Sequence, residues 1–321
     1  VTIPDSVISI GIFAFDNCNI LTHVMIPQGV KQLGRYVFYG CSALSSITIP
    51  DSVVSIEDSA FFGCSNLTSI QLGNGIKNIG MWAFGSSGLT DITIPASVTN
   101  IEKLVFSDCR ELKSITVDEN NPKYHSAGNC LIETASKTLI AGCKASVIPD
   151  ENSVTSLGDS AFQNCIGLAS IAIPASVTSM GSNPFYGCKS LIRITVDENN
   201  PKYHSAGNCL IETASKALIV GCQASVIPVD GSVVVIGPYA FSNCGNLTSI
   251  TIPDGVTSIS DYAFYYCNHL TSVVIPASVT SIGWGVFYFC SGLVSITVDE
   301  NNPTYHSAGN CLIETKSKTL I

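Results

Sequence analysis

Charged residues are scarce in this chain. Lysine and arginine together number 15 and aspartate and glutamate 24 among 321 residues, so only 12% of the chain is charged. The formal net charge is −9 at pH 7. An acidic chain without a basic cluster repels a phosphate backbone, so we expect no nucleic-acid partner.

Long hydrophobic runs are also absent, although 46% of the residues are hydrophobic. A membrane-spanning helix needs roughly 18 or more consecutive apolar residues, so we expect no membrane insertion within this chain. The chain opens on Val1-Thr2-Ile3-Pro4, already inside a repeated unit, and stops inside another repeated segment. Both ends look like cuts in a longer chain, so a missing signal peptide carries no weight.

The motifs of common chemistries are missing as well. There is no Cys-x-x-Cys pair, glycine-rich phosphate loop, nucleophile elbow or cluster of metal ligands. We therefore expect no enzymatic activity, no cofactor and no metal. Asp118-Glu119 and Asp197-Glu198 precede Asn-Asn-Pro turns, so an oxygen-rich calcium loop is an alternative, although the spacing of an EF-hand is absent.

What fills the chain is a repeated unit, typified by residues 44–64, LSSITIPDSVVSIEDSAFFGC. Leu44, Ile47 and Ile49 alternate with polar residues, which predicts a short strand with one buried face. Pro50 ends that strand, because proline lacks the backbone donor that a sheet requires. The irregular apolar spacing that follows predicts a second short extended or 3₁₀ piece and then a loop anchored by Phe61.

The repeat length follows from the phenylalanines of the Phe-x-x-Cys or Phe-x-x-Ser segments. Most successive positions differ by 23 residues, and the step from Phe84 to Phe106 is 22. A unit this short cannot enclose a core alone, so stacked units must share one. These phenylalanines are Phe15, Phe38, Phe61, Phe84, Phe106, Phe162, Phe185, Phe241, Phe264 and Phe287.

A glycine often follows the second isoleucine-like position of the unit, as in Gly34 and Gly80. Other copies carry Glu57, Glu102 or Ser260 there. Glutamate is poorly tolerated at positive φ, so this position predicts no left-handed turn.

Three related inserts interrupt the units, at 117–149, at 196–228 and, truncated, at 298–321. Residues 130–133 and 138–141 flank a four-residue turn and predict a β-hairpin that pairs Cys130 with Ala141. We expect the hairpin to add strands to the stack, giving one solenoid domain over 1–321. A histidine recurs at the same place in each insert, which predicts a structural role such as a turn hydrogen bond; these are His125, His204 and His306.

The chain has 14 cysteines, nine of them at one position of the unit. Equivalent side chains in stacked units point in parallel, a geometry that disfavours disulfides between units. We expect buried free thiols that fill space as small apolar groups. Within the inserts a Cys130–Cys143 or Cys209–Cys222 disulfide is the disfavoured alternative, and reactive sulfur is another.

The pattern L-x-x-I-x-I-P-x-x-V-x-x-I-G-x-x-A-F-x-x-C, as at 44–64 and 247–267, resembles the leucine-rich repeats of the BspA-like bacterial surface proteins. The insert residues 120–122 and 128–132 look like the hairpin-bearing spacer of that family. The resemblance covers essentially the whole chain. It implies a right-handed, β-rich horseshoe of the α/β type with short non-helical or 3₁₀ convex segments. It also implies secretion or surface display in a bacterium, with adhesion to matrix or plasma glycoproteins of a host; related protozoan proteins leave the source open.

If the strands line the concave side, as in leucine-rich repeats generally, their exposed positions form two columns of mostly serine and threonine. Such residues bind a glycan or peptide edge, or simply solvate a strand. Five residues break the pattern and are the candidate ligand contacts: His23, Met25, Gln71, Asp91 and Arg193.

A second candidate surface is aromatic. Aromatic residues gather in the later units, where they either pack or form an interface. This group comprises Trp82, Trp284, Tyr262, Tyr265, Tyr266, Tyr288 and Phe289.

The sequence thus predicts a secreted or cell-surface binding module that contacts extracellular proteins or glycans by many weak contacts along a repeated surface. The alternative is a structural stalk or spacer that presents another domain and has no ligand of its own.

Overall fold

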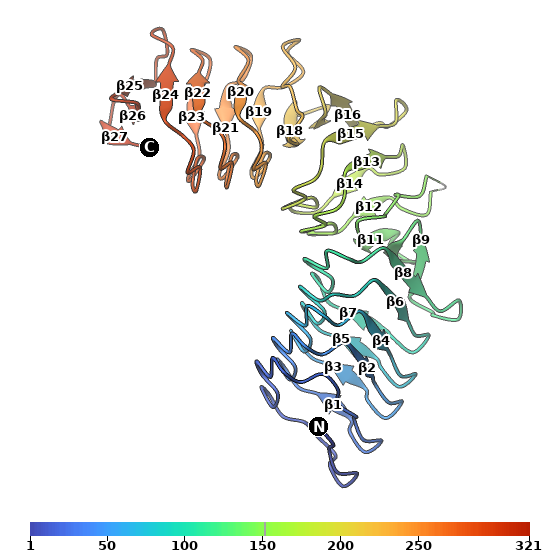
Figure 1. The fold of residues 1–321 in the computed structure, drawn as a ribbon. Helices are drawn as coiled ribbons and strands as arrows, with labels where there is room; N and C mark the ends of the chain where they lie inside the picture. The colour runs from blue at the N-terminus through green and yellow to red at the C-terminus, as the bar shows by residue number, and fades with distance from the viewer. Residues whose placement is uncertain (151) are drawn as a thin grey trace. The chain divides into compact units, whose positions relative to one another are not determined.

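The computed structural model describes residues 1–150 and 152–321. They form two compact units, one of Val1–Leu168 with Ser179–Cys188 (unit 1) and one of Ala169–Thr178 with Lys189–Ile321 (unit 2). Each is a β-solenoid, as predicted, and no helix occurs in the described ranges. The units are described separately, and the single domain expected over 1–321 remains a prediction. Figure 1 shows the successive turns of each.

One turn of the solenoid, called a rung below, has two short strands and a loop. In residues 44–64 they are β2 (Ser46–Thr48), β3 (Ser55–Ile56) and the loop 57–64, called the tip loop. The predicted alternation is confirmed, since Ile47 is buried between the exposed Ser46 and Thr48. No 3₁₀ turn forms, and the second strand is extended.

Unit 1 contains four sheets. Parallel pairing builds three of them, and the fourth joins the first insert to the two rungs that follow it. Their strand orders are β1 (Gln32–Leu33)-β3-β5 (Asn78–Ile79)-β7 (Asn100–Ile101); β2-β4 (Ser69–Gln71); β6 (Asp91–Ile94)-β8 (Ser114–Val117); and β14 (Ser179–Met180)-β12 (Ser156–Leu157)-β11 (Thr138–Ala141)-β10 (Cys130–Glu133)-β9 (Tyr124–Ala127).

The pairing register explains why the repeat length is kept. Ser46, Ile47 and Thr48 lie opposite Ser69, Ile70 and Gln71, each 23 residues later. A strict repeat therefore places like residues side by side, and the buried face of one rung continues that of the next.

The first insert adds strands to the stack, as predicted, because β11 pairs in parallel with β12. The predicted hairpin register was wrong. Cys130 pairs with Ala127 of β9, and Ala141 lies opposite Leu131. A β-bulge between Leu131 and Ile132 shifts the pairing by one residue, and a bulge of this kind leaves no sign in the alternation of side chains.

Unit 2 repeats this plan with its own insert strands. β18 joins its insert to the next rung through parallel pairing with β19. The strand orders are β13 (Ser170–Ile173)-β15 (Arg193–Val196); β16 (Tyr203–Ala206)-β17 (Cys209–Glu212)-β18 (Ala217–Val220)-β19 (Val235–Ile236)-β21 (Ser258–Ile259)-β23 (Ser281–Ile282); β20 (Ser249–Thr251)-β22 (Ser272–Ile275)-β24 (Ser295–Val298); and β25 (Tyr305–Ala308)-β26 (Cys311–Glu314)-β27 (Thr319–Leu320).

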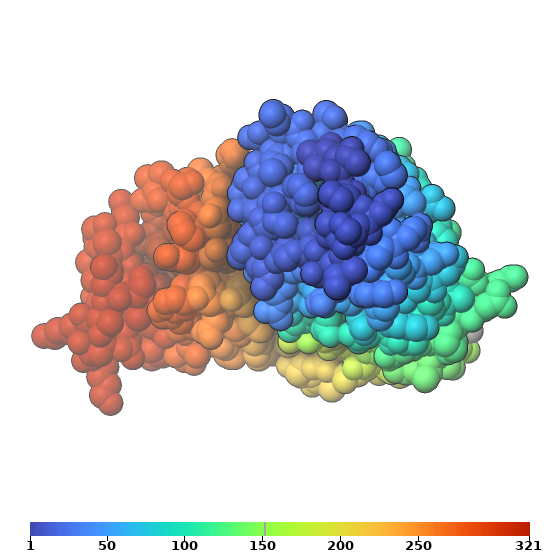
Figure 2. All heavy atoms as spheres, turned by 90° about the horizontal axis from the view of Figure 1, so that it is seen from below, coloured from blue at the N-terminus to red at the C-terminus, as the bar shows by residue number. Residues whose placement is uncertain are grey.

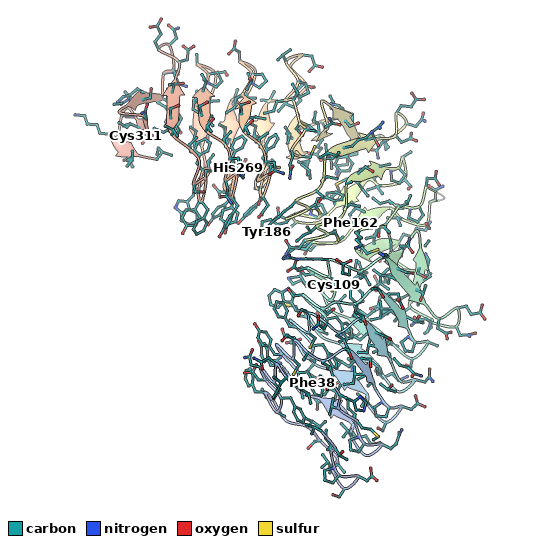
Figure 3. The ribbon with its side chains drawn as sticks, viewed as in Figure 1. Phe38, Cys109, Phe162, Tyr186, His269 and Cys311 are labelled. Atoms are coloured by element: carbon teal, nitrogen blue, oxygen red, sulfur yellow. The ribbon has the colours of Figure 1, made fainter. Side chains whose placement is uncertain are left out.

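The core of each unit is a set of columns along the solenoid. The ring of Phe61 stacks between those of Phe38 and Phe84, with centroid distances of 5.3 and 5.8 Å, and all three side chains are fully buried. Figure 3 labels Phe38 and Phe162 within the rungs that they fill. Figure 2 looks onto the first rungs of unit 1, in blue.

Candidate functional site

The predicted strand-face residues are all exposed, but the structure does not gather them into one site. Asp91 begins β6 opposite Ser114 of β8, and Gln71 ends β4 opposite Thr48 of β2. Asp91 accepts a hydrogen bond at 2.8 Å from the hydroxyl of Thr90, its own neighbour. Their role as ligand contacts therefore stays a prediction.

The two other candidates in unit 1 do come together. His23 and Met25 line one depression of about 650 Å³ with Thr2 and Thr48. Arg193 belongs to unit 2, where it begins β15 opposite Ser170. Gln71, Asp91 and Arg193 thus lie in strands, whereas Met25 forms an isolated bridge with Thr2 and His23 lies outside any strand.

The tip loops carry a feature that the sequence did not reveal. In each, the residue two before the core phenylalanine and the residue two after it have positive φ; around Phe61 these are Ser59 (54°) and Gly63 (75°). The glycine position considered above, by contrast, has no positive φ at Gly34 or Gly80, as predicted. The remaining tip-loop residues at positive φ are Phe13, Asn17, Tyr36, Gly40, Trp82, Ser86, Leu104, Asp108, Ser160, Asn164, Asn183, Gly187, Tyr239, Asn243, Tyr262, Tyr266, Gly285 and Phe289.

Several of these left-handed positions hold bulky aromatic side chains. The left-handed conformation costs an L-residue roughly 1–2 kcal/mol. Ser160 and Gly285 occupy the same position of the loop as Tyr36 and Tyr262, so the fold does not require an aromatic ring there. Strained residues of this kind concentrate at functional sites.

Unit 2 gathers its tip-loop aromatics into an exposed group, called the aromatic cluster below. Trp284 is 69% exposed, Tyr288 51%, Phe289 46% and Tyr266 37%. The rings support one another across rungs, since Tyr266 stacks on Phe289 at 4.6 Å and Trp284 meets Tyr262 edge-on at 4.9 Å. Pre-ordered rings lose little conformational entropy on binding, so they suit an interface.

Unit 1 has a pocket of about 420 Å³ across its tip loops, a volume within the usual range for ligand sites. One end is aromatic and includes Tyr36 and Trp82 on either side of Ser59. The other end is polar and includes Asp108 and Asn164. Of these residues, only Trp82 was a candidate from the sequence. A comparison of tip positions among repeats would have exposed Tyr36 as well, because other repeats carry Ser59 or Ser160 at that position.

The cysteines of the repeat belong to the core. The Cys64 thiol donates to the backbone carbonyl of Phe38 at 3.1 Å, and Cys109 donates to that of Phe84 at 3.0 Å. Burial, with a smaller contribution from Cys18, raises the pKa of the Cys41 thiol from 9.0 to about 11. All fourteen cysteines are free thiols, and eleven of them are buried, which confirms the expected burial for most; Cys18 and Cys188 are half-buried and Cys311 is exposed.

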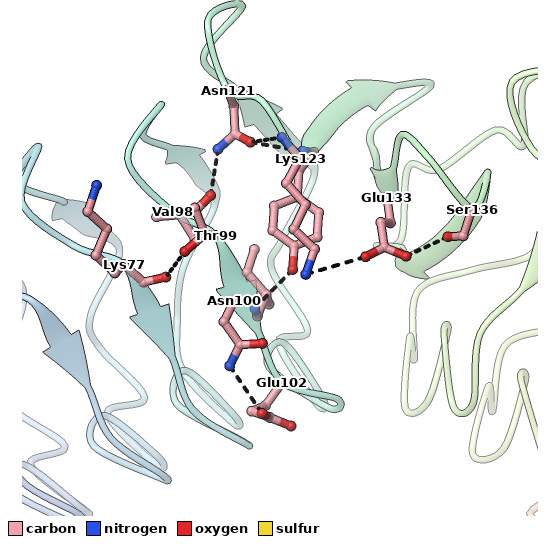
Figure 4. Close-up of polar contacts among 11 residues, drawn as sticks. Lys77, Val98, Thr99, Asn100, Glu102, Asn121, Lys123, Glu133 and Ser136 are labelled. Atoms are coloured by element: carbon pink, nitrogen blue, oxygen red, sulfur yellow. Dashed lines mark hydrogen bonds and ion pairs between the residues drawn. The ribbon is translucent and has the colours of Figure 1, made fainter.

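The inserts are held by a network that Figure 4 shows for the first of them. The amide of Asn121 donates to the carbonyls of Pro95 and Val98 at 2.8 and 3.0 Å, and its oxygen accepts from the backbone of Lys123 and Tyr124 at 2.9 and 2.8 Å. Four bonds from one side chain fix the insert on the preceding rung.

Other polar residues of the insert are also engaged locally. His125 Nδ1 lies 2.9 Å from the Thr134 hydroxyl, and His204 and Thr213 repeat the contact, which confirms the expected structural hydrogen bond. Asp118 accepts from the backbone of Asn120 at 2.9 Å. Among the described residues no group of three or more His, Cys, Asp or Glu side chains is placed to hold a metal. These ranges also contain no helix with the length and apolarity needed to cross a bilayer.

Short parallel strands in stacked rungs with a shared leucine- and isoleucine-rich core define a leucine-rich repeat solenoid. The family model described as "BspA type Leucine rich repeat region (6 copies)" matches residues 1–113, 31–139, 133–207 and 212–318. The chain therefore belongs to the BspA-type leucine-rich repeat family.

Solved structures agree with this assignment. A leucine-rich cell surface protein from Faecalibacterium prausnitzii is 30% identical, with a TM-score of 0.59 over 93% of this chain and 78% of that one. A leucine-rich repeat protein from Eubacterium ventriosum is 24% identical, with a TM-score of 0.54 over 86% and 84% of the two chains, and supports the fold alone. Comparison with the curated proteins finds no significant match.

Proposed function

We propose that this chain is a binding module displayed outside the cell, and that it holds protein ligands through the aromatic cluster of unit 2. The observation that carries the proposal is that exposed rings stand on strained backbone. Tyr266 and Phe289 have φ of 59° at a loop position where Gly63 and Gly187 occur in unit 1. A ring at this position adds backbone strain and exposes apolar surface, which a binding role explains.

The composition of the cluster matches the anchors of protein interfaces. Tryptophan and tyrosine are the side chains most enriched at interface hot spots, where truncation costs 2 kcal/mol or more. Trp284, Tyr288 and Phe289 come from one tip loop, and Tyr262, Tyr265 and Tyr266 come from the preceding one, so a single partner surface can cover both. Contacts repeated along the rungs add to the affinity.

Display outside the cell is supported by the family and by the Faecalibacterium relative, which is a cell surface protein. Extracellular matrix and plasma glycoproteins of a host are the partners that the family resemblance suggests. Burial raises the pKa of the Cys41 thiol to about 11 and that of the Cys130 thiol to about 12. At these two positions this supports a role in packing rather than in catalysis, since a reactive cysteine needs a thiolate.

The test is binding of the full chain to immobilised matrix and plasma glycoproteins, measured by surface plasmon resonance. Trp284→Ala and Tyr288→Ala should each weaken a saturable interaction by about 30-fold or more, the equivalent of a hot spot. Val274→Ala is the matched control, because it removes an exposed apolar side chain from strand β22 of the same unit. Arg193→Ala tests the strand face, and circular dichroism checks folding.

Three results would contradict the proposal. Equal loss in Val274→Ala and Trp284→Ala would mean that the cluster has no special role. If only Arg193→Ala weakened binding, the ligand site would lie on the strand face and not on the aromatic cluster. A complete lack of saturable binding would leave the structural stalk as the better account.

A further inference from the structure

The aromatic cluster of unit 2 stands beside a carboxylate. Asp261 comes directly before Tyr262 in its tip loop, and its Oδ1 accepts a hydrogen bond at 2.8 Å from the backbone amide of Trp284 in the next rung. Asp261 is exposed, and the Trp284 side chain is the most exposed of the cluster. An accessible negative charge therefore lies next to the most accessible ring.

Unit 1 contains the same carboxylate with a cation bound to it. Asp58 stands at the equivalent position, and its Oδ1 accepts from the backbone amide of Met81 at 3.0 Å. Its other oxygen, Oδ2, pairs at 3.2 Å with the guanidinium of Arg35, which belongs to the preceding rung. The chain itself thus shows that a guanidinium fits against this carboxylate while Oδ1 holds the next rung.

Unit 2 lacks that arginine. Arg35 stands in the segment Gly-Arg-Tyr at 34–36, and the equivalent segment of unit 2 is Gly-Pro-Tyr at 237–239. The backbone register is the same, since in both units the amide of the tyrosine donates to the aspartate carbonyl of the next rung at 3.1 Å. Pro238 therefore replaces the cation, and Asp261 has no ion-pair partner among the described residues.

The surroundings of this carboxylate favour a cationic ligand group. The tip loops at 237–246, 260–269 and 283–292 contain no lysine and no arginine. The face of a tryptophan or tyrosine ring is negative and attracts a cation within about 6 Å of its centroid. A guanidinium stacks on such a face and also pairs with a carboxylate through parallel N–H···O bonds, whereas an ammonium group is a point charge. Charge complementarity thus favours arginine.

We propose that the protein partner of the aromatic cluster supplies an arginine side chain, which pairs with Asp261 and contacts the exposed ring of Trp284. The guanidinium takes the place beside Asp261 that Arg35 has beside Asp58 in unit 1. This inference rests on the proposed function, because it names the chemistry of the partner at the same cluster.

Peptides that differ only in charge test the partner's side of the contact. The probes are glycine–serine dodecapeptides with three arginines, three lysines, three glutamates or three citrullines, since citrulline is a neutral isostere of arginine. In a Trp82→Phe background of the full chain, Trp284 is the single tryptophan and reports binding by fluorescence. We expect saturable binding of the arginine peptide, binding of the citrulline and glutamate peptides that is about tenfold weaker or less, and a loss of arginine affinity as NaCl rises from about 50 to 300 mM.

Asp261→Asn tests the chain's side, because it removes the charge and keeps an oxygen for the Trp284 amide. It should weaken binding of the arginine peptide by about tenfold or more. Asp159→Asn is the matched control. Asp159 accepts from the backbone amide of Ser182 at 2.8 Å in the same way, but Ser160 follows it where the cluster has a ring. This control should leave binding unchanged.

Pro238→Arg gives unit 2 the arginine that unit 1 has. The new side chain should pair with Asp261 as Arg35 pairs with Asp58, so it should compete with the arginine peptide and weaken its binding by about tenfold. Pro238→Gln is the neutral control and should bind as the unaltered chain does. The thermal midpoint of each variant, followed by circular dichroism, should stay within a few degrees.

Several results would overturn the inference. They include equal affinity for the arginine and citrulline peptides, undiminished arginine binding by Asp261→Asn or Pro238→Arg, and equal loss in Asp159→Asn. Self-association that Trp284→Ala abolishes, in a chain that binds no peptide, would assign the cluster to a second copy instead.

The same variants separate this inference from the proposed function. Glycoprotein binding that is lost in Trp284→Ala but kept in Asp261→Asn would refute the arginine contact and uphold the proposed function. Arginine-peptide binding that requires both side chains, without saturable binding of any glycoprotein, would uphold the arginine contact and refute the glycoprotein partners.

Discussion

Replacing Phe61 by alanine tests whether the stacked ring column holds unit 1 together. The Phe61 ring is fully buried and has a stacked neighbour on each face, at 5.3 and 5.8 Å. Removing a buried phenylalanine typically costs about 3–5 kcal/mol, which includes the lost contacts and the cavity. For a unit of this size each kcal/mol lowers the melting temperature by about 2–4 °C, so we expect a fall of roughly 6–20 °C.

The neighbouring residue is a matched control. Phe62 loses the same atoms on replacement by alanine, but it is half-buried and stacks on a single ring, that of Tyr39, at 5.3 Å. We expect Phe62→Ala to cost about 1 kcal/mol, mainly the single ring contact. Differential scanning calorimetry and urea unfolding measure both variants.

The comparison between the two variants can refute the reasoning. If Phe61→Ala lowers the stability no more than Phe62→Ala, the column does not contribute as its burial implies. If Phe61→Ala changes the urea m-value as well as the midpoint, the rungs have lost their cooperativity, and the two-state cost does not apply.

Three further predictions follow from particular contacts. Asn121→Ala breaks four hydrogen bonds and should destabilise the chain by about 2–4 kcal/mol in urea unfolding; a loss below 0.5 kcal/mol would contradict it. Gly142→Ala forces a methyl group against a phenylalanine ring and should cost about 1–3 kcal/mol, whereas Gly245→Ala meets nothing closer than 4.0 Å and should be neutral by calorimetry. The Cys41 pKa of about 11 gives about a hundredfold less thiolate at pH 8 than the ordinary value of 9.0, so a colorimetric thiol assay should show the exposed Cys311 reacting fast and Cys41 reacting only after denaturation; fast reaction of Cys41 in the native chain would refute its burial.

The sequence contained the repeat, and with it most of the fold. Ile47 and Phe61 recur at a fixed interval, and stacking follows because a 23-residue unit cannot bury these side chains alone. The burial of the repeat cysteines and the hydrogen bond of His125 were predictable for the same reason, since identical positions in stacked rungs have identical neighbours. The hairpin register at Cys130 was not predictable, because the bulge that sets it depends on local backbone geometry.

The sites were much harder to predict than the fold. His23 and Asp91 differ from the serine or threonine found at the equivalent position of most other repeats. That difference does not show whether the residues lie near one another in the folded chain. The backbone at Tyr36 and Trp82 is left-handed because of the way the tip loop turns. Tyrosine and tryptophan are not typical of left-handed positions, so the sequence does not indicate this conformation.

The periodicity and the apolar pattern of each unit already specify a stack of short rungs with a shared core, because both are properties of the single unit. The positions of the pocket and of the exposed rings depend instead on tertiary contacts. Tip loops separated by an insert became neighbours around a pocket, and rings from successive rungs met in one exposed group. Both features depend on how the backbone turns between strands. These turns bring together residues that are far apart in the sequence, so the repeat pattern alone does not predict them.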